Sequence, residues 1–510
     1  MNGLARIRRR YDRIGADAGY VALIVAISVP LIFALAALAV DVANWHAQAA
    51  RLQNAADAAA LAGVVYLPAD PTTATSIAND FAKRNGYTSG TGVTVTAKQV
   101  TGHPSQMQVT ISATVSNGFG AAIGRPSTVI TRSSVADYQA PIPVGGPCNV
   151  LGNEPSGGAW GPSKKSSSCS TTPQLWLSIS GPGEPKQNGD RYQANVCNPP
   201  ADRCSGTNQD YDPAGYFYVV RVKQAGTVDI EVYDPSNVVC AAGPACPGDG
   251  RPSAGRPVET TSYIVRGPYH QSRPDDTPVV PGCTPMQYKP DDTALSEQWV
   301  PLCTITDAQP GDYLVQVRTN IPLGSNPADD ALANPSLSNA GANYFSLRAS
   351  YSDSRDNNNI SLFGLERMGL YANQRNFNSN FFLARVPSGA AGKHLRVEFF
   401  DIGDGSGGWS LSILPPSEAT AGGSPVTAFA NCQGTGPVSG AMPTCSIRAN
   451  TGTAFQGKIE SISVPIPVGY TCNDASPDGC WTRIGYAFAA PSDATTWTAS
   501  LEGDPVRIIR

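Results

Sequence analysis

Residue types that could carry catalysis are few in this chain, and they do not form a known catalytic motif. The four histidines, His46, His103, His270 and His394, are scattered through the sequence. The nucleophile elbow G-x-S-x-G, the zinc-binding H-E-x-x-H and the phosphate-binding Walker A loop do not occur. The G-x-G-x-x-G match Gly403–Gly408 lies between two predicted strands, whereas the dinucleotide fingerprint requires a strand followed by a helix. We therefore expect a hairpin loop there, and a chain that is not an enzyme and uses no cofactor.

Two groups of carboxylates could bind a metal ion. Asp401 and Asp404 lie in the sequence DIGDGSGG, and Asp353 and Asp356 lie in SDSRDNNN. Carboxylate oxygens on flexible turns are ligands that calcium prefers. Neither group has the spacing of an EF-hand loop, and runs of Asp, Asn and Gly are common turn formers. The turn is the favoured interpretation, with calcium as the weaker alternative at both places.

The twelve cysteines all follow position 147, and their even number predicts disulfides in an oxidising compartment. No C-x-x-C or Cys/His cluster supports zinc. Several neighbours in the sequence are close enough to staple single loops, although the sequence leaves the connectivity open. These pairs are Cys197/Cys204, Cys240/Cys246, Cys432/Cys445 and Cys472/Cys480.

The element that must position everything else is an uncharged apolar run, Ala18–Val40. Its 23 residues would form a helix of ~35 Å, long enough to cross the ~30 Å hydrocarbon core of a bilayer. Pro30 is expected to kink this helix without ending it. Five arginines and one acid lie between positions 6 and 13, so the positive-inside rule predicts a cytoplasmic N-terminus.

A cleaved signal peptide is the main alternative to a membrane anchor. Small residues before Ala36 and Ala39 fit a cleavage site, but the run exceeds the usual 7–15 apolar residues of a signal peptide. We therefore predict the lipid bilayer as a partner through residues 18–40. With 15% charged residues and a net charge of −4, the chain has no electrostatic basis for binding nucleic acid.

The helix is expected to continue beyond the membrane with one face of small and apolar residues. Alternating steps of four and three place these residues on a single seam. Small side chains allow another backbone to approach closely. Packing against the chain's own domain is the favoured explanation, and a helix–helix interface with a partner protein is the alternative. The face consists of Leu38, Val42, Trp45, Ala49, Leu52, Ala56, Ala59 and Gly63.

The sequence GYVALIVAISVPLIFALAALAVDVANWHAQAARLQNAADAAALAG (residues 19–63) resembles the N-terminal segment of TadE/TadG-like Flp pilus-assembly proteins, TadG-like members in particular. The resemblance implies a membrane-anchored, exported protein of a Flp pilus system, whose helix face would contact other pilus-assembly proteins. Two features depart from the family. Five residues after Gly19 stands Ile24, where relatives processed by prepilin peptidase carry Glu. The D-x-S-x-S metal site of von Willebrand A domains, found in many TadG-like proteins, does not occur. We therefore do not infer from the resemblance that prepilin peptidase cleaves this chain or that it adheres through a metal ion.

Beyond Gly63 the sequence predicts a short helix over SIANDFAKRNG that ends at Gly86, strands in GVTVTAKQV, SQMQVTISATV and STVITRSSVADY, and a helical turn in NGFGAAIG. These elements form a small α+β domain of pilin-like shape. The β-rich domains that follow include a predicted strand over LFGLERMGLY. Phe217–Asp234 and Phe381–Asp401 form an internal repeat, each a strand ending in Arg-Val, a turn, and a strand ending in an aromatic residue and Asp. Two copies predict two mainly antiparallel β-sandwiches. The sequence PGDYLVQVRT (310–319) resembles a strand of bacterial prepeptidase C-terminal-type sandwiches. The predicted segments are a cytoplasmic basic segment (1–17), a transmembrane helix (18–40), the juxtamembrane helix with its α+β domain (41–140), a Pro/Gly/Ser-rich linker (141–173) and two sandwiches (174–352 and 353–510).

The fold class is thus a membrane-anchored multidomain protein, and three functions compete. The first is a non-enzymatic, single-pass component of a Flp/Tad-type pilus assembly or surface adherence system, with most of the chain extracellular or periplasmic. The second is a secreted or surface carbohydrate- or matrix-binding protein exported by a cleaved signal, because exposed tryptophans could bind sugars. The third, and weakest, is a surface hydrolase with an active site assembled from distant residues. The exported tryptophans are Trp160, Trp176, Trp299, Trp409, Trp481 and Trp497.

Overall fold

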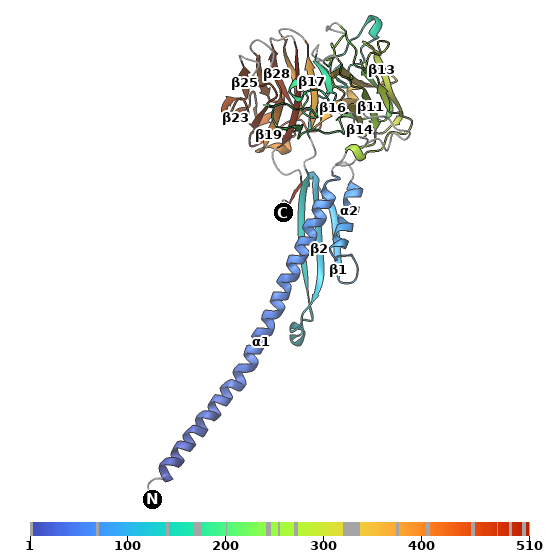
Figure 1. Cartoon of the computed structure of the whole chain (residues 1–510). Coiled ribbons are helices and arrows are strands. Elements are labelled where there is room, and N and C mark those ends of the chain that lie inside the picture. Colours follow the sequence, from blue (N-terminus) through green and yellow to red (C-terminus); the bar gives the residue numbers. More distant parts are fainter. Residues whose placement is uncertain are drawn as a thin grey trace. The chain divides into compact units, whose positions relative to one another are not determined.

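The computed structural model divides the chain into two compact units, whose elements are labelled in Figure 1. Unit 1 comprises Met1–Gln139 and Asp504–Arg510, and unit 2 comprises Ala140–Gly503. The structure describes residues 4–67, 71–101, 103–138, 142–167, 169, 175–199, 201–240, 246–252, 255–269, 274–319, 337–373, 377–403, 409–449, 454–476, 478–488, 492–501 and 506–508.

Unit 1 is built around one long helix, α1, which runs from Leu4 to Val64. Pro30 lies inside α1 and does not end it. At 1.5 Å per residue, the 61 residues of α1 extend over ~90 Å. The predicted membrane span and the predicted juxtamembrane helix are therefore one continuous element, drawn in dark blue in Figure 1.

A second helix, α2 (Pro71–Arg84), packs closely against the end of α1. A Cβ added at Gly63 would lie 2.7 Å from the carbonyl oxygen of Ala74 and 2.9 Å from the Cβ of Ala78. Only glycine permits this approach of the two backbones. Gly86, predicted to end the helix, has φ +90° and lies just beyond the last turn of α2.

A four-stranded antiparallel sheet packs on α1 and completes unit 1. The first three strands and the short helical turn η1 (Gly120–Ile123) lie where the sequence predicted them. The fourth strand, β30, comes from the other end of the chain and pairs with β3 through Tyr138 and Val506. Residues 506–508 therefore belong to unit 1 and not to the predicted second sandwich. The order is β1 (Val93–Val100), β2 (His103–Ser116), β3 (Ser127–Tyr138) and β30 (Val506–Ile508).

Unit 2 is a sandwich of two large antiparallel sheets with a shared apolar core. In the described residues, one sheet has eleven strands: β13 (Trp299–Ala308), β10 (Gly226–Tyr233), β15 (Ala342–Tyr351), β6 (Leu175–Ser180), β17 (Arg367–Ala372), β29 (Asp493–Leu501), β19 (His394–Phe400), β26 (Ile459–Pro465), β23 (Ala430–Thr435) and β24 (Gly440–Thr444), with β5 (Val150–Leu151) beside β15.

The other large sheet has ten strands in the described residues: β12 (Met286–Tyr288), β11 (Thr261–Arg266), β14 (Gly311–Thr319), β9 (Tyr216–Val222), β16 (Ile360–Leu365), β4 (Pro143–Gly145), β18 (Phe377–Arg385), β28 (Trp481–Phe488), β20 (Trp409–Leu414) and β25 (Ser446–Ala449). Two small sheets accompany them: β22 (Ser424–Pro425), β21 (Thr420–Ala421) and β27 (Tyr470–Thr471), and the pair β7 (Cys204–Ser205) and β8 (Thr207–Asn208).

The internal repeat recurs in the strand pairing of unit 2. β9 pairs with β14 as β18 pairs with β28, and β10 lies between β13 and β15 as β19 lies between β26 and β29. The closing aspartates, Asp234 and Asp401, are both buried and have φ of 53° and 58°. Their N–H groups donate to the carbonyl oxygens of Gln298 and Lys458, which precede equivalent strands. The predicted fold class, with antiparallel sandwich-like sheets behind a long helix, is confirmed.

The boundaries inside unit 2 differ from the predicted ones because the two halves share their sheets. β6 pairs with β17, and β16 pairs with β4, which in turn pairs with β18. The segment predicted as a linker, 141–173, therefore supplies β4 and β5 to the sheets. The predicted strand over LFGLERMGLY is two strands, β16 and β17, separated by Glu366 with φ 65°, and they lie in different sheets.

Ion pairs from the described parts of the loop between β6 and β9 also join the two halves. Arg191 lies 2.6 Å from the Glu398 carboxylate in β19, and Lys458 lies 3.2 Å from Asp202. Lys186, which is fully buried, donates to Asp210 at 2.9 Å. A buried ammonium is stable only when paired in this way.

Six disulfides staple single loops of unit 2, and each links cysteines that are neighbours in the sequence. The local pairing favoured for four of them is confirmed. The bonds are Cys148–Cys169, Cys197–Cys204, Cys240–Cys246, Cys283–Cys303, Cys432–Cys445 and Cys472–Cys480.

Candidate functional site

The first half of α1 exposes apolar side chains all the way round. Between Tyr20 and Val40 every side chain is exposed except Ser28 and Ala37, which are half-buried. This stretch belongs to one helix that is long and apolar enough to cross a membrane, with a mean hydropathy of 2.8 in its most apolar window. A helix that is apolar on every face requires an apolar surrounding.

Asp41 ends the apolar stretch and binds a loop that lies 77 to 79 residues further along the chain. Its carboxylate is 3% exposed and accepts hydrogen bonds from the N–H groups of Gly118 (2.8 Å), Phe119 (3.0 Å) and Gly120 (2.6 Å). These three amides begin the turn between β2 and β3. Successive backbone N–H groups form a cradle for a negative charge, and charge-assisted hydrogen bonds are the strong ones.

Trp45, one helical turn after Asp41, holds the other side of the same loop. Its indole N–H donates to the side-chain oxygen of Asn117 at 2.8 Å. Asn117 in turn donates to the carbonyl oxygen of Arg125 at 2.8 Å, and its own N–H donates to Pro126 at 2.9 Å. The VDVANW sequence therefore acts as a clamp that fixes the β2–β3 hairpin on α1. We call Asp41, Trp45 and Asn117 the hairpin clamp.

The small-residue face of α1 packs inside unit 1. Leu52, Ala56 and Ala59 are 0% exposed, and they contact the core of the sheet and α2. The favoured prediction for this part of the face, packing against the chain's own domain, is therefore confirmed, and these three side chains are not open to a partner protein. Leu38 lies before the clamp and is 49% exposed.

The predicted calcium ligands that the structure describes take part in turns. The Asp401 carboxylate accepts the N–H of Gly457 at 2.5 Å and is buried. Asp356 accepts the N–H of Asn358 at 3.0 Å, and Asp353 forms an ion pair with Arg355. Asp353 and Asp356 bond within their own loop, whereas Asp401 binds the separate loop that carries Gly457, so the carboxylates do not come together. Asp404 lies outside the described residues.

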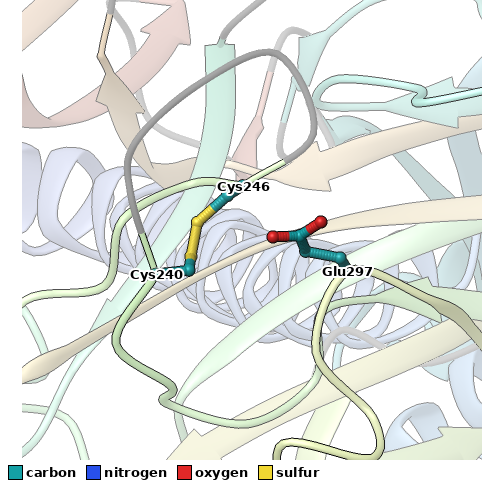
Figure 2. Close-up of side chains that lie close together, drawn as sticks. All are labelled: Cys240, Cys246 and Glu297. Atoms are coloured by element: carbon teal, nitrogen blue, oxygen red, sulfur yellow. A yellow bond between two sulfur atoms is a disulfide. The ribbon is translucent and has the colours of Figure 1, made fainter.

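Two groups of ligand-type side chains lie close enough to hold a metal ion in the part of the chain that the structure describes. Figure 2 shows the first, in which the Glu297 carboxylate extends toward the Cys240–Cys246 disulfide. The second is Asp474 beside Cys472–Cys480. In both groups the two sulfur atoms are bonded to each other, and metal binding by cysteine needs free thiolates. The arrangement is that of stapled loops.

The first half of unit 2 contains a group of three buried carboxylates, and the sequence did not predict that they would be buried near one another. Burial raises the pKa of Asp234 to about 7 and that of Glu259 to about 8. Burial also raises the pKa of Asp249, whose carboxylate accepts the N–H groups of Val238 and Tyr344 at 2.8 and 2.9 Å. Asp249 thus fastens the loop after β10 to β15, and the Glu259 carboxylate accepts from the side chain of Asn237 in the same loop at 2.6 Å. No local spacing in the sequence marks these acids.

The aromatic side chains proposed for sugar binding are used in packing. Trp176 and Trp497 are 0% exposed, and Trp409 and Trp481 are buried. Trp299 is half-buried, donates its N–H to the carbonyl oxygen of Pro155 and has the guanidinium of Arg348 over its ring at 4.0 Å.

The histidines predicted to have no catalytic role lie apart. His46 is exposed on α1, and His394 is exposed at the start of β19. His103 begins β2, and His270 lies outside the described residues. The G-x-G-x-x-G match follows β19, and β20 after it belongs to the other sheet, so the connection is not the predicted hairpin.

Comparison with known proteins places the family signal in the N-terminal segment. No curated protein matches the chain. Two solved structures are similar to the chain only weakly, with TM-scores of 0.15. One is the N-terminal CBM22-1-CBM22-2 tandem domain of Paenibacillus barcinonensis Xyn10C, 12% identical, covering 55% of this chain and 80% of that one. The other is Paenibacillus xanthan lyase, 11% identical, covering 80% of this chain and 35% of that one. Residues 19–69 match the model of the Tad family, described as "Putative Flp pilus-assembly TadE/G-like". The part of α1 that carries the exposed span, Asp41 and Trp45 is thus a TadE/G-like segment, as its sequence predicted.

Proposed function

We propose that this protein is a non-enzymatic component of a Flp/Tad-type pilus assembly or surface adherence system. Residues 18–40 hold it in the cell membrane as a single-pass anchor, with the N-terminus in the cytoplasm and the chain after Asp41 exported. The observation that carries the proposal is the division of α1 at Asp41. From Tyr20 to Val40 the helix is apolar and almost wholly exposed, and after Asp41 the helix is the spine of a folded unit. Both parts lie within the TadE/G-like match.

The charge distribution around the span supports the proposed orientation. Five arginines precede the span, and the positive-inside rule keeps such a segment in the cytoplasm. The export of unit 2 is supported by its cysteines, since all twelve are paired in six disulfides and no free cysteine is found. Such bonds persist in oxidising compartments and are rare in the cytoplasm.

The role of the described polar groups supports a protein without catalysis. Asp401, Asp356 and Asp353 stabilise turns, and the cysteines staple loops. The two halves of unit 2 act in this proposal as spacer or binding modules carried on a membrane-anchored spine.

The proposal is tested by deleting the protein in its native host and counting pili by electron microscopy alongside surface adherence. We expect the loss of both, and rescue by the full chain. Rescue should fail when residues 1–40 are replaced by a cleavable signal peptide, although the same folded units are exported. A deletion strain that assembles pili and adheres like its parent would show that the proposal is wrong.

The membrane anchor is tested separately by the intact, unreduced mass of the protein from isolated membranes. An uncleaved chain with six disulfides should be about twelve hydrogens lighter than the reduced sequence, because each bond removes two. A shorter chain beginning after Ala36 or Ala39, recovered from the medium, would instead support the secreted binding protein.

A further inference from the structure

We propose that the tip of the β2–β3 hairpin, Phe119 to Arg125, inserts into the membrane–water interface beside α1. Unit 1 then contacts the lipid surface twice, through its helix and through this tip. The inference rests on the proposed anchoring of residues 18–40. It assigns a lipid-binding role to a loop that lies far from the span in the sequence.

The tip exposes apolar side chains that nothing in unit 1 covers. Phe119 is 52% exposed and Ile123 is 76% exposed, two of the six large apolar side chains that are exposed outside the span in the described residues. Ala121 and Ala122 between them are exposed as well. A short loop that presents two large apolar side chains together, on a turn of small residues, has the composition of an interfacial anchor.

The hairpin clamp holds this apolar tip at the end of the membrane span. Asp41 directly follows the apolar run, and its carboxylate binds the amide of Phe119 at 3.0 Å. The run of 23 residues is ~35 Å long against a hydrocarbon core of ~30 Å, so its last residues reach the boundary of that core. Trp45 lies ~6 Å further along the helix, at the level where tryptophans gather in membrane proteins.

The backbone of the tip is prepared for a surrounding that is poor in water. The amides of Gly118, Phe119 and Gly120 bond to Asp41. Within the loop, the N–H of Ala122 donates to Phe119 at 3.0 Å and that of Arg125 donates to Gly120 at 2.9 Å. Inserting a loop into the interface is unfavourable when its amides lack hydrogen-bond acceptors. Here most of the amides already have acceptors within the protein.

The charge at the edge of the tip fits a lipid surface better than a second protein surface. Arg125 is exposed directly after the apolar turn, where its guanidinium can reach a lipid phosphate while Ile123 lies deeper. The apolar tip also continues the exposed apolar surface of the span, which the bilayer covers in the proposed function. The bilayer is therefore the occupant that we assign to this loop.

The test is photocrosslinking of the full-length chain in nanodiscs of phosphatidylethanolamine and phosphatidylglycerol. p-Benzoylphenylalanine replaces one residue at a time: Phe119, Ile123, Leu31 in the span, or Asn79 in α2. Asn79 follows Ala78, which packs on Gly63, and Gly63 lies ~33 Å beyond Asp41 along α1. The four sites are exposed, and an unchanged melting temperature confirms that each variant is folded.

We expect the mass of one intact lipid to be added at Phe119, Ile123 and Leu31, and no addition at Asn79. Lipid adducts at Leu31 without any at Phe119 and Ile123 would overturn the inference and leave the anchor standing. Crosslinks from the tip to protein would overturn it equally, since the loop would then face a partner chain. The absence of lipid adducts at Leu31 would overturn the proposed anchor, and the tip contact with it.

Discussion

Replacing Asp41 by alanine should release the tip of the β2–β3 hairpin while α1 and the sheet stay folded. The carboxylate is 3% exposed, and it is the acceptor for the N–H groups of Gly118, Phe119 and Gly120 at 2.8, 3.0 and 2.6 Å. Alanine removes all three hydrogen bonds together with the negative charge that strengthens them. Trp45 still holds Asn117, so the base of the loop remains attached to the helix.

The size of the effect follows from the strength and exposure of these bonds. A hydrogen bond to a charged group contributes about 1.5–3 kcal/mol, but the sum of three is an overestimate because such bonds are not independent. Gly118 and Phe119 are exposed, so water can hydrate their freed amides once the tip opens away from the helix. We therefore expect the free energy of opening the tip to fall by about 2–3 kcal/mol in total. Since 1.4 kcal/mol corresponds to a factor of ten, the open tip should become about 30–140 times more populated.

Hydrogen exchange measured by mass spectrometry on the full chain in nanodiscs tests this directly. Peptides covering residues 117–125 should exchange about 30–140 times faster in Asp41→Ala, while peptides from β3 keep their protection. Asp41→Asn retains one acceptor oxygen and should give a smaller acceleration. Asp57→Ala is the matched control on the same helix, because the Asp57 carboxylate accepts one bond, from Gln53 at 2.8 Å.

Two results would refute this reasoning about the clamp. Unchanged exchange of residues 117–125 in Asp41→Ala would mean that the three hydrogen bonds do not hold the tip. Faster exchange along β3 as well as at the tip would mean that Asp41 supports the whole unit and not the loop alone.

Three further predictions concern the packing, the disulfides and the buried acids. Gly63→Ala should destabilise unit 1 by about 1–3 kcal/mol in thermal unfolding, because its Cβ would lie 2.7 Å from the Ala74 carbonyl oxygen; an unchanged melting temperature would contradict the close packing. Replacing Cys283 and Cys303 by serine should cost unit 2 about 3 kcal/mol in urea, since their bond closes a loop with a sequence separation of 20; a midpoint equal to that of the parent would count against this. Burial raises the pKa of Glu259 to about 8, so the folded state keeps a proton that the unfolded chain releases, and stability should fall between about pH 5 and pH 8. Glu259→Gln should weaken that fall by up to about 4 kcal/mol at pH 8, and urea titrations with the same pH slope in both proteins would refute it.

The fold of unit 1 could be read from the sequence because its signals are local. A charge-free run of helical length predicts a span, and alternating β-branched residues predict β1, β2 and β3. Gly86 ended a helix as expected because only a residue that tolerates positive φ fits there. The close approach at Gly63 was implied by the spacing of small residues, although the sequence left open whether α2 or a partner protein would fill it.

The domain boundaries could not be predicted because they depend on pairing between distant strands. A segment rich in Pro, Gly and Ser reads as a linker, yet Val144 of β4 joins Gly364 of β16 and Ala384 of β18. Nothing within residues 141–173 specifies those neighbours. In the same way, the repeat was visible at Asp234 and Asp401, whereas the continuous sheets that join its copies were not.

The candidate site shows the same limit. The string VDVANW was recognisable by its resemblance to a family, but the partners of Asp41 and Trp45 lie 72 to 79 residues away in the sequence. Their contacts exist only once the hairpin is folded against α1. Runs such as SDSRDNNN look alike in sequence whether they bind calcium or cap a turn, because both uses require the same oxygen atoms. Asp356 is engaged as a cap.

The pairing of β30 with β3 gives a physical reason why unit 1 can carry so large an insertion. Tyr138 and Val506 are partners in the ladder, so the chain leaves unit 1 and returns to it at adjacent positions. An insertion whose ends lie together leaves the host fold undistorted, since it replaces a connection between two neighbouring strands. Leu52 and the small residues after it can therefore pack against the sheet as they would in a separate domain. Asp41 binds the turn that precedes β3, whereas the insertion begins after Tyr138 at the other end of β3. Changes in unit 2 therefore need not disturb the loop that Asp41 holds.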